Sequence, residues 1–319
     1  MKTYFITGGA GFIGSSLIEK LIDNNKVVVL DNFNDYYLPS IKMDNIRSFL
    51  DNDNFILYKG DIRDRELLNI IFSCNNIDCV IHLAAQPGVR ESIVNPYLYQ
   101  EINYMGTVNL LEEMIKHNVK NIIFSSSSSV YGNNLNTPFK EDMDTSFSIS
   151  PYATSKKACE VILHTYHKLY NLNTLILRFF TVYGPKQRPD LAINKFTNLI
   201  LDSKPITMYG DGNSLRDYTY IDDIINGILL SIKYLELNNN TYEIINLGSS
   251  NPIKLIDVIK TLVTKLNKEA KVIRKEKQSG DMDATWADIS KAQKVLGYKP
   301  FTNFNDGIDK YINWYNKTK

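Results

Sequence analysis

The stretch FITGGAGFIGSSLIEKL at residues 5–21 decides the fold, because a glycine-rich turn in it joins an apolar run to a helical run. Gly8, Gly11 and Gly14 follow a GxxGxxG spacing. In a strand–turn–helix unit, the first glycine permits a tight turn, the second lets the backbone approach a pyrophosphate, and the third allows close helix–strand packing. The helix N-terminus attracts the phosphates. The pattern alone would also fit a purely structural turn, but its place between a strand and a helix predicts a dinucleotide site.

Short apolar runs alternate with longer helical stretches through the first half of the chain. The expected strands are 3–7, 27–30, 55–58, 79–84, 122–124 and 174–179, and the expected helices are 12–24, 64–73, 97–117 and 151–170. Continuous apolar runs suit strands that are buried on both faces of a parallel sheet. Strands that alternate with helices form a doubly wound sheet. We therefore predict an α/β fold with a Rossmann-type, doubly wound parallel sheet.

The pattern becomes irregular after about residue 180, where Pro185, Pro189 and Pro205 interrupt it. The later segment contains helical stretches and a strand-like YEIINL, at 222–236, 255–268, 304–316 and 242–247. We predict a dinucleotide-binding domain at residues 1–180 and a smaller C-terminal α/β substrate-binding lobe at 181–319. The lobe is expected to interleave partly with the first domain and to lie on the C-terminal side of the sheet.

Composition restricts the partners of the chain. Lys and Arg number 36 against 35 Asp and Glu, so the formal net charge is +1 and any phosphate binding must be local. No apolar run approaches the roughly 20 residues that span a bilayer, and the N-terminus lacks the apolar stretch of a signal peptide. Cys74, Cys79 and Cys159 form no CxxC pair and are predicted to be small buried hydrophobes of a reducing compartment. We expect a cytoplasmic protein that binds neither nucleic acid nor membrane.

Asp31 ends the second predicted strand, VVVLD. A carboxylate at this point can accept hydrogen bonds from the hydroxyls of the adenosine ribose. The same charge would repel a ribose phosphate, so NAD is favoured over NADP. The following DNFND is turn-like, so a capping or turn role for Asp31 is the alternative. GDIRD after the third strand places Asp61 and Ile62 where an adenine would lie.

The stretch SPYATSKKACE at residues 150–160 places Tyr152 and Lys156 four positions apart. Residues at this spacing meet on a helix, and such pairs also arise by chance. Directly before this helix, the strand NIIF runs into SSSSSVYG, which would project a hydroxyl at the C-terminal edge of the sheet. A dinucleotide turn, a hydroxyl at a strand end and a Tyr–Lys pair therefore converge on one active site.

The sequence resembles, over essentially its whole length, the extended short-chain dehydrogenase/reductase family of NAD-dependent sugar-nucleotide epimerases and dehydratases. The resemblance is carried, in chain order, by GGAGFIGS, GDIRD, HLAA, NYMGT, SSSVYG, SPYATSK, RFFTVYGP, GDGNSLRDYTYIDD and GDMDATWADISKA. It implies NAD as the cofactor. It also implies the cofactor-binding residues Gly8, Gly11, Phe12, Ile13, Gly14, Asp31, Asn32, Asp61, Ile62, Leu83, Ala84, Ala85, Gln86, Asn103, Ser125, Tyr152, Lys156 and Phe180.

The chemistry that the resemblance implies assigns a role to each catalytic residue. Tyr152 would remove the proton of a sugar hydroxyl, and because a free tyrosine has a pKa near 10 it needs help to ionise. Lys156 and the positive nicotinamide would favour the phenolate, and Lys156 would also hold the nicotinamide ribose. Ser127 would hydrogen-bond the reacting oxygen. His164 and His167 lack carboxylate or cysteine partners at ligand spacing, so we predict packing roles for them and no metal site.

Two departures from the family pattern indicate which reaction follows. Dehydratases of the family carry an Asp-Glu pair directly after the catalytic hydroxyl, where this chain has Ser128 and Ser129. UDP-glucuronate decarboxylases place a glutamate at the position of Ser129. Because a serine cannot replace a carboxylate in acid–base catalysis, we predict a UDP-sugar 4-epimerase that works through a 4-keto sugar. The alternative from another class is a catalytically silent NAD-binding protein, which the intact Ser127, Tyr152 and Lys156 disfavour.

The sugar is predicted from RFFTVYGPKQRPDLA at residues 178–192, which resembles the UDP-glucuronate 4-epimerase pattern except at Lys186 and Leu191. Thr181 stands where UDP-glucose 4-epimerases usually have an asparagine. Ser128, Ser129 and Thr181 would donate hydrogen bonds to a sugar carboxylate, and UDP-glucuronate is therefore favoured. Alternatively, these small side chains only leave room for the hydroxymethyl group of UDP-glucose or UDP-N-acetylglucosamine.

Binding of the UDP moiety is assigned by the resemblance as well. Arg216 matches the pyrophosphate arginine of the family, and Arg188 is a second candidate. Gln278 and Asp281 match the region that contacts uridine and its ribose. A surface pair of Arg216 with Asp217 is the alternative for that arginine. Phe196 and Tyr209 are expected to be pocket walls, with core packing as the alternative, and the helices 97–117 and 151–170 are expected to form a homodimer interface.

Overall fold

The computed structural model describes residues 1–276 and 284–318. The chain divides into two compact units. The first unit comprises Met1–Gly132, Asp144–Arg178 and Gly227–Ile245, and the second comprises Asn133–Met143, Phe179–Asn226 and the described part of Asn246–Lys319. The units are thus more interleaved than a division at residue 180 would make them.

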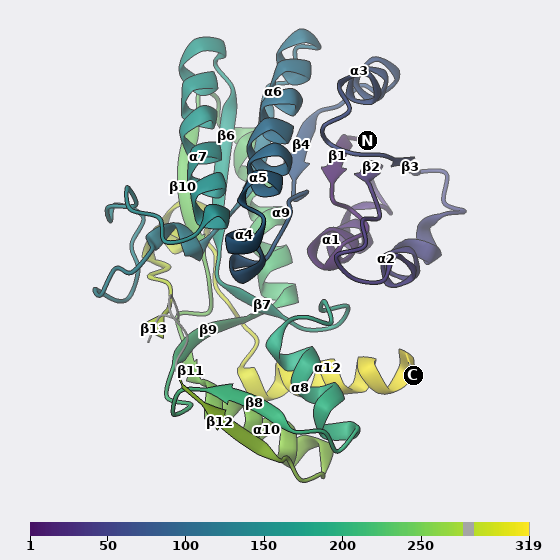
Figure 1. Ribbon diagram of the computed structural model, residues 1–319. Coiled ribbons are helices and arrows are strands. Elements are labelled where there is room, and N and C mark those ends of the chain that lie inside the picture. The colour runs from purple at the N-terminus through teal and green to yellow at the C-terminus, as the bar shows by residue number, and fades with distance from the viewer. Residues whose placement is uncertain (277–283, 319) are drawn as a thin grey trace. The chain divides into compact units, whose positions relative to one another are not determined.

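A seven-stranded sheet forms the centre of the first unit, in the order β10-β6-β5-β4-β1-β2-β3 (Figure 1). Its strands are β1 (Thr3–Thr7), β2 (Lys26–Asp31), β3 (Phe55–Lys59), β4 (Cys79–His82), β5 (Asn121–Ser127), β6 (Asn173–Phe179) and β10 (Tyr242–Leu247). The pairs of β1 with β2 and β4, of β2 with β3, and of β4 with β5 are parallel. This mostly parallel, Rossmann-like sheet confirms the predicted fold class.

Helices cover both faces of this sheet. They are α1 (Phe12–Leu21), α2 (Pro39–Ile46), α3 (Arg65–Cys74), α4 (Val89–Val94), α5 (Pro96–Tyr99), α6 (Gly106–Lys116), α7 (Pro151–Tyr170) and α9 (Ile221–Leu237), with the short helical turns η1 (Arg47–Phe49), η2 (Gln100–Met105) and η3 (Ser128–Tyr131). On one face, buried side chains of β1, β2, β4, β5 and β6 pack against α3, α6 and α7 in one apolar core. On the other face, Tyr4 donates a hydrogen bond to Glu236 of α9 at 3.2 Å.

Three sequence predictions are corrected in this unit. The helix expected at 97–117 is divided into α5, the π-helical turn η2 and α6. The strand YEIINL, which we had placed in the smaller lobe, is β10 at the edge of the large sheet, where the N–H of Thr174 donates to the carbonyl of Thr241 at 2.8 Å. Cys79 and Cys159 are buried as predicted, but Cys74 is exposed because it ends α3 beyond that helix's apolar face.

The second unit contains shorter strands. They are β7 (Thr181–Tyr183), β8 (Ile206–Tyr209), β9 (Leu215–Tyr220), β11 (Pro252–Lys254), β12 (Val272–Lys275) and β13 (Ala284–Thr285). β9 pairs with β7, β11 and β13, and β8 pairs with β12. The helices of this unit are α8 (Ala192–Leu201), α10 (Leu255–Leu266), α11 (Ser290–Leu296) and α12 (Phe304–Thr318).

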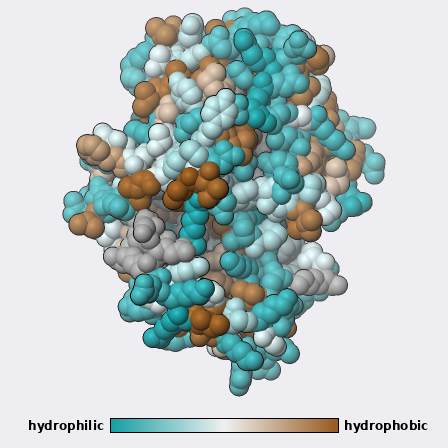
Figure 2. Space-filling model, viewed as in Figure 1, coloured by the Kyte–Doolittle hydropathy of each residue, from teal (hydrophilic) through white to brown (hydrophobic). Residues whose placement is uncertain are grey.

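The visible surface mixes hydrophilic and hydrophobic side chains (Figure 2). No described helix combines the length and the apolar character that crossing a membrane requires.

Candidate active site

The glycine turn between β1 and α1 has no room for side chains. Gly8 has a φ of +71°, and a Cβ there would lie 2.8 Å from the backbone nitrogen of Ala84. A Cβ on Gly14 would lie 2.5 Å from the carbonyl oxygen of Gly8. α1 begins after Gly11, and no described side chain caps it, so N–H groups of its first turn can face an anion. The turn therefore fits the pyrophosphate of a dinucleotide.

Asp31, the last residue of β2, holds two loops through its carboxylate. Oδ2 accepts the N–H of Ala10 at 3.0 Å, and Oδ1 accepts the N–H of Phe33 at 2.9 Å. Burial raises the pKa of Asp31, while these N–H groups and the positive Lys42 act in the opposite direction. Each carboxylate oxygen has two lone pairs. Asp31 can therefore hold the turn and accept a ribose hydroxyl, so the two predicted roles are compatible.

The ends of β2 and β3 are joined by Asn32, whose Nδ2 donates to Asp61 Oδ2 at 2.8 Å. Asp61 also pairs with Arg63 at 2.8 Å. The side chain of Ile62 is buried, and its Cγ2 would lie 2.5 Å from a Cβ on Gly106 in α6. Ile62 thus packs against α6, and its contact with an adenine stays a prediction.

The loop after β4, which carries the predicted residues Leu83, Ala84, Ala85 and Gln86, is held by Asn103. Asn103 Oδ1 accepts the N–H of Gln86 at 2.7 Å, and its Nδ2 donates to the carbonyl of Gln86 at 3.2 Å. Nδ2 also donates to Ser155 Oγ at 2.9 Å. Asn103 lies in η2, and such π-helical turns are frequent at functional sites. One side chain therefore ties the predicted cofactor loop to α7.

The helix α7 carries Tyr152 in its first turn and Lys156 one turn later. Its start is fixed by Ser150, whose Oγ accepts the N–H of Ala153 at 3.1 Å. Tyr152 is half-buried, and its ring meets the ring of Tyr99 edge-on, with 6.2 Å between the ring centres. The predicted helix and its predicted boundaries match the structure, so the Tyr–Lys pair lies on one helical face.

Lys156 is only 3% exposed. Its Nζ donates to the carbonyl oxygen of Ser125 at 2.8 Å and lies 4.9 Å from the centre of the Phe124 ring. Burial lowers the pKa of Lys156 to about 8. The ammonium group is still largely protonated at neutral pH, so it can supply a positive charge on the same helix as Tyr152.

Ser127 is the last residue of β5, as the sequence predicted for a hydroxyl at a strand end. Its Oγ accepts the N–H of Ser129 at 3.2 Å and the hydroxyl of Ser129 at 3.0 Å. Because both lone pairs of Ser127 are used, its own proton is left to be donated. Ser128 begins the turn η3 directly afterwards.

A buried ion pair beside β5 was not predicted from the sequence. Ser126 Oγ donates to Glu160 Oε1 at 2.7 Å, and Arg178 donates to both carboxylate oxygens of Glu160 at 2.9 and 2.8 Å. The guanidinium of Arg178 lies 4.8 Å from the centre of the Tyr131 ring. The signal was present, because an arginine inside the apolar strand TLILRF needs a buried partner.

In the second unit, Phe180 and Thr181 lie where the chain enters β7. Phe180 is buried, and its N–H donates to the carbonyl of Leu247 at 3.1 Å. Thr181 is half-buried and pairs with Tyr218 of β9 in parallel register. Their predicted contacts, with the cofactor and the sugar respectively, stay predictions.

Arg216 lies in the middle of a small sheet, between Ile253 of β11 and Thr285 of β13. Its neighbour Asp217 is fully buried, and its carboxylate accepts N–H groups, including that of Ala287 at 3.1 Å. Successive side chains of a strand point to opposite faces. The alternative of a surface pair between Arg216 and Asp217 is therefore wrong, and a pyrophosphate-binding role for Arg216 stays a prediction.

The remaining predicted substrate residues differ in their surroundings. Arg188 forms a bidentate ion pair with Asp190, at 2.9 and 2.7 Å. Phe196 is buried in α8, in line with the packing alternative, and Tyr209 is half-buried at the end of β8. Gln278 and Asp281 lie outside the described residues.

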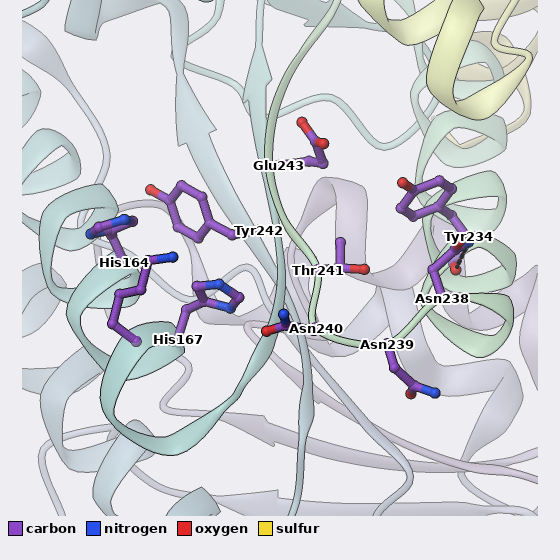
Figure 3. Close-up of a pocket in the computed structure, with 10 residues that line it drawn as sticks. His164, His167, Tyr234, Asn238, Asn239, Asn240, Thr241, Tyr242 and Glu243 are labelled. Atoms are coloured by element: carbon purple, nitrogen blue, oxygen red, sulfur yellow. Dashed lines mark hydrogen bonds between the residues drawn. The ribbon is translucent and has the colours of Figure 1, made fainter.

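His164 and His167 lie in a different part of the first unit, where a surface pocket of about 420 Å³ is lined by α7, α9 and β10 (Figure 3). His164 is exposed and its ring centre is 4.9 Å from that of Tyr242, while His167 Nδ1 lies 2.8 Å from the carbonyl of Leu172. None of the predicted catalytic residues lines this pocket. Among the described residues, no group of His, Cys, Asp or Glu side chains is arranged to hold a metal ion.

Comparison with known proteins agrees with this geometry. The family model of GDP-mannose 4,6 dehydratase matches residues 5–311. A UDP-glucuronate 4-epimerase from Thermodesulfobacterium geofontis is 42% identical over 98% of this chain and 96% of its own length. The solved UDP-glucuronic acid 4-epimerase from Bacillus cereus, in complex with UDP-glucuronic acid and NAD, is similar with a TM-score of 0.93. It is 36% identical over 99% of this chain and 100% of that one.

A UDP-glucose 4-epimerase from Thermotoga maritima, solved with UDP-glucose, is also similar. Its TM-score is 0.90 and its identity is 32%, over 99% of each chain. Together with the glycine turn, the carboxylate after β2 and the Tyr–Lys pair on α7, these likenesses confirm the resemblance read from the sequence motifs. The chain belongs to the NAD-dependent epimerase/dehydratase family of sugar-nucleotide enzymes.

Proposed function

We propose that the chain is an NAD-dependent UDP-sugar 4-epimerase that interconverts UDP-glucuronate and UDP-galacturonate through a 4-keto sugar. The observation that carries the proposal is the catalytic set of Ser127, Tyr152 and Lys156, in which the lysine is buried and the serine has a proton to donate. The likeness to UDP-glucuronate 4-epimerases from Thermodesulfobacterium geofontis and Bacillus cereus supports the same reaction.

The first unit fits NAD. Gly8 and Gly14 let the turn pack against Ala84 and against its own backbone, where a Cβ would come to 2.8 and 2.5 Å. The start of α1 has no side-chain cap, so its N–H groups can bind a pyrophosphate. Asp31 provides the negative charge that suits a ribose without a phosphate. Bound NAD supplies the acceptor and the donor of the hydride that leaves and then returns to the sugar carbon.

Tyr152 is the proposed base for the sugar 4-hydroxyl. A tyrosine ionises near pH 10 in water, and a nearby positive charge favours the ionised form. Lys156, on the same helix and largely protonated at neutral pH, provides that charge. In the return half of the cycle, Tyr152 would give its proton back to the oxygen of the keto sugar while the hydride returns to the carbon. Because the hydride is returned, the reaction is redox-neutral overall.

Ser127 is proposed to donate its hydroxyl proton to the reacting oxygen. Its two acceptor positions are taken by the N–H and the hydroxyl of Ser129, which directs the remaining proton away from Ser129. Charge develops on the reacting oxygen as Tyr152 takes its proton, so a donor held in place stabilises the transition state.

Epimerisation is favoured over dehydration although the matched family model is named after a dehydratase. Elimination of water needs an acid and a base beyond the tyrosine. At the positions where dehydratases carry an Asp-Glu pair, this chain has Ser128 and Ser129, and Ser129 is already bonded to Ser127. Return of the hydride to the other face of the keto sugar is the reaction that remains.

The choice of sugar rests on hydroxyl groups. We assign Ser128 and Thr181 to the sugar carboxylate, which neutral donors can hold without an opposing charge. The predicted donation from Ser129 is not compatible with its hydroxyl bond to Ser127 Oγ at 3.0 Å. UDP-glucose is the second candidate, supported by the likeness to the Thermotoga maritima enzyme, and in that case the small side chains make room for a hydroxymethyl group.

We also propose a homodimer formed through α6 and α7, which lie side by side (Figure 1). The exposed face of α7 carries Val161 and Leu169, 57% and 66% exposed, and Met105, the last residue of η2 directly before α6, is 48% exposed. A dimer would cover these apolar groups. Val161→Glu should then lower the mass measured by light scattering to that of one chain, whereas Leu237→Glu, at an exposed site on α9, should not. A cytoplasmic location stays a prediction from the sequence.

The decisive experiment offers the purified protein UDP-glucuronate, UDP-glucose and UDP-N-acetylglucosamine separately and identifies the sugars by NMR. Formation of UDP-galacturonate is the expected result. Turnover of UDP-glucose alone would support the second candidate. If folded, NAD-loaded protein turns over none of these sugars, the proposal that the chain is an epimerase is refuted.

A further inference from the structure

His82, at the end of the central strand β4, is 1% exposed and has a partner at each ring nitrogen. Nδ1 lies 2.6 Å from Thr7 Oγ1, at the end of β1. Nε2 lies 2.9 Å from Thr107 Oγ1, in α6. One buried ring therefore connects three elements of the first unit, and the mechanism proposed above does not use it.

The partners determine where the protons lie. The hydroxyl of Thr107 donates to the carbonyl of Asn103 at 2.6 Å, so its oxygen must accept from His82 Nε2–H. In a neutral ring, Nδ1 then carries no proton and accepts the hydroxyl of Thr7. Thr7 Oγ1 in turn accepts the N–H of Ala84 at 3.2 Å. The hydrogen bonds therefore run in one direction, from the N–H of Ala84 through Thr7, His82 and Thr107 to the carbonyl of Asn103.

A neutral ring agrees with its surroundings. Burial, and secondarily the positive charge of Lys156, lowers the pKa of His82 to about 3. A charged ring would also donate from Nδ1 to Thr7, and the Thr7 hydroxyl would lose its acceptor. The neutral form with the proton on Nε2 is therefore the form that satisfies all partners.

One end of this chain of hydrogen bonds lies at the cofactor turn. Ala84 is the second residue of the loop after β4, and its backbone nitrogen is the atom that a Cβ on Gly8 would approach to 2.8 Å. Thr7 directly precedes Gly8. The bond from Ala84 to Thr7 thus holds the loop against the glycine turn.

The other end lies at the catalytic helix. Asn103, whose carbonyl accepts from Thr107, donates through Nδ2 to Ser155 Oγ at 2.9 Å. Ser155 Oγ donates to the carbonyl of Tyr152 at 2.8 Å. Cys159, one turn after Ser155, places its Sγ 3.3 Å from the Asn103 carbonyl. The chain of hydrogen bonds therefore ends at the backbone carbonyl of Tyr152, the residue assigned as the base.

We propose that His82 is a positioning residue: its neutral, Nε2-protonated ring sets the placement of the catalytic helix α7 relative to the glycine turn that holds NAD. This inference rests on the proposed function, because it concerns the alignment of Tyr152 with the cofactor. His82 itself transfers no proton to substrate. The hydrogen bonds of Thr7, to His82 and Ala84, affect NAD binding. The hydrogen bond between His82 and Thr107 affects the catalytic step.

Two isosteric substitutions separate the two sides. Thr107→Val removes the acceptor of His82 Nε2–H, and Thr7→Val removes the donor to Nδ1 together with the acceptor of the Ala84 N–H. A hydrogen bond lost in the interior costs enough to change an equilibrium or a rate about tenfold. We expect Thr107→Val to lower kcat about tenfold with NAD affinity changed less than about threefold. Thr7→Val should weaken NAD binding about tenfold.

Thr107→Ser and Thr7→Ser are the matched controls, because each keeps the hydroxyl and loses the methyl group. Each should stay within about threefold of the wild type in the quantity that its valine counterpart changes. A merely structural role would lower the Tm of both valine variants while leaving kcat and NAD affinity unchanged, and that result would overturn the proposal. Serine variants as impaired as the valine variants would also overturn it, since packing of the methyl group would then explain the effect.

The protonation state provides a test that does not depend on activity. In protein labelled with ¹⁵N-histidine, the His82 ring should show a protonated Nε2 and an unprotonated Nδ1 at every pH from 5 to 8. A charged ring or a proton on Nδ1 would refute the proposal. If the wild type turns over no UDP-sugar, the proposed function fails, while the NMR spectrum and the NAD affinity of Thr7→Val still decide the role of His82.

Discussion

Arg178 and Glu160 form a bidentate ion pair whose side chains are each only 1% exposed. Burial alone would raise the pKa of Glu160, but Arg178, the Ser126 hydroxyl and the positive Lys157 together outweigh it, and the pKa of the carboxyl is lowered. Glu160 lies on α7, one turn after Lys156, and Arg178 lies on β6. The pair thus anchors α7, the helix that carries Tyr152 and Lys156, to the sheet.

Removing one partner of this pair should destabilise the protein strongly. Arg178→Met removes the bidentate partner of a buried carboxylate and leaves it only the Ser126 hydroxyl and Lys157. Losing one partner of a buried ion pair costs about 3–5 kcal/mol. Arg47→Met, in the exposed pair with Asp44, should cost less than about 1 kcal/mol. Urea unfolding measures both. Equal costs for the two variants would mean that the buried pair does not anchor α7.

Lys156 should make stability depend on pH in a defined direction. Its pKa is 10.5 in the unfolded chain and about 8 in the fold, where burial disfavours the charged form. Between these values the unfolded chain binds more protons, so the free energy of unfolding rises with pH. In NAD-free protein, the free energy of unfolding of the wild type should rise by about 2–3 kcal/mol more than that of Lys156→Met between pH 8 and pH 10.5. Taking the difference in free energy of unfolding between the two proteins cancels the contributions of the other titrating groups. A difference that stays flat or falls with pH would contradict a lowered pKa of Lys156.

Tyr152→Phe should abolish nearly all turnover while NAD and UDP-sugar still bind. General acid–base catalysis contributes about 10²–10⁴-fold, and phenylalanine keeps the ring while it loses the proton-transfer group. Tyr170→Phe, at the other end of α7, is the matched control and should retain activity. Initial rates by NMR and ligand affinities by calorimetry separate chemistry from binding. A loss below tenfold for Tyr152→Phe would mean that another group is the base.

The glycine turn offers a test in which backbone strain is held constant. Gly8 and Gly297 have φ values of +71° and +70°, but a Cβ at Gly8 would meet Ala84 whereas at Gly297 it would meet nothing within 4 Å. We expect the wild type to copurify with NAD and Gly8→Ala to lose it, because the loop after β4 must move. Gly297→Ala should keep NAD, although its positive φ also lowers its Tm. Retention of NAD by both variants would show that the turn tolerates a side chain.

The parts of the fold that could be predicted are those whose pattern is local. The strand 3–7 and the helix 151–170 match the structure because continuous apolar runs and a Ser-Pro start are read directly from sequence. The helix at 97–117 was drawn as continuous, since no periodicity reveals the π-helical turn around Asn103. None of the described strands of the second unit was predicted, and β7, β11 and β13 have at most three residues each.

The proposed catalytic residues were predicted from short motifs and from the family resemblance that these motifs carry, since Tyr152 and Lys156 share a helix and Ser127 ends a neighbouring strand. The groups that position them were not, because their partners are distant in sequence. His82 and Arg178 stand out only as polar residues inside apolar strand runs. The identities of Thr7, Thr107 and Glu160 as their partners depend on tertiary packing.

Thr181 provides the sharpest test of the sugar. If its hydroxyl donates to the carboxylate of UDP-glucuronate, its loss removes a hydrogen bond to a charged group, worth about 1.5–3 kcal/mol. Thr181→Val should therefore lower kcat/KM for UDP-glucuronate about ten- to a hundredfold. The same change should affect UDP-glucose much less, because its hydroxymethyl group forms only a neutral bond. Thr181→Ser, which keeps the hydroxyl, should behave like the wild type with both sugars. If instead the wild type turns over UDP-glucose efficiently and ignores UDP-glucuronate, Thr181 only shapes the pocket and the enzyme is a UDP-glucose 4-epimerase.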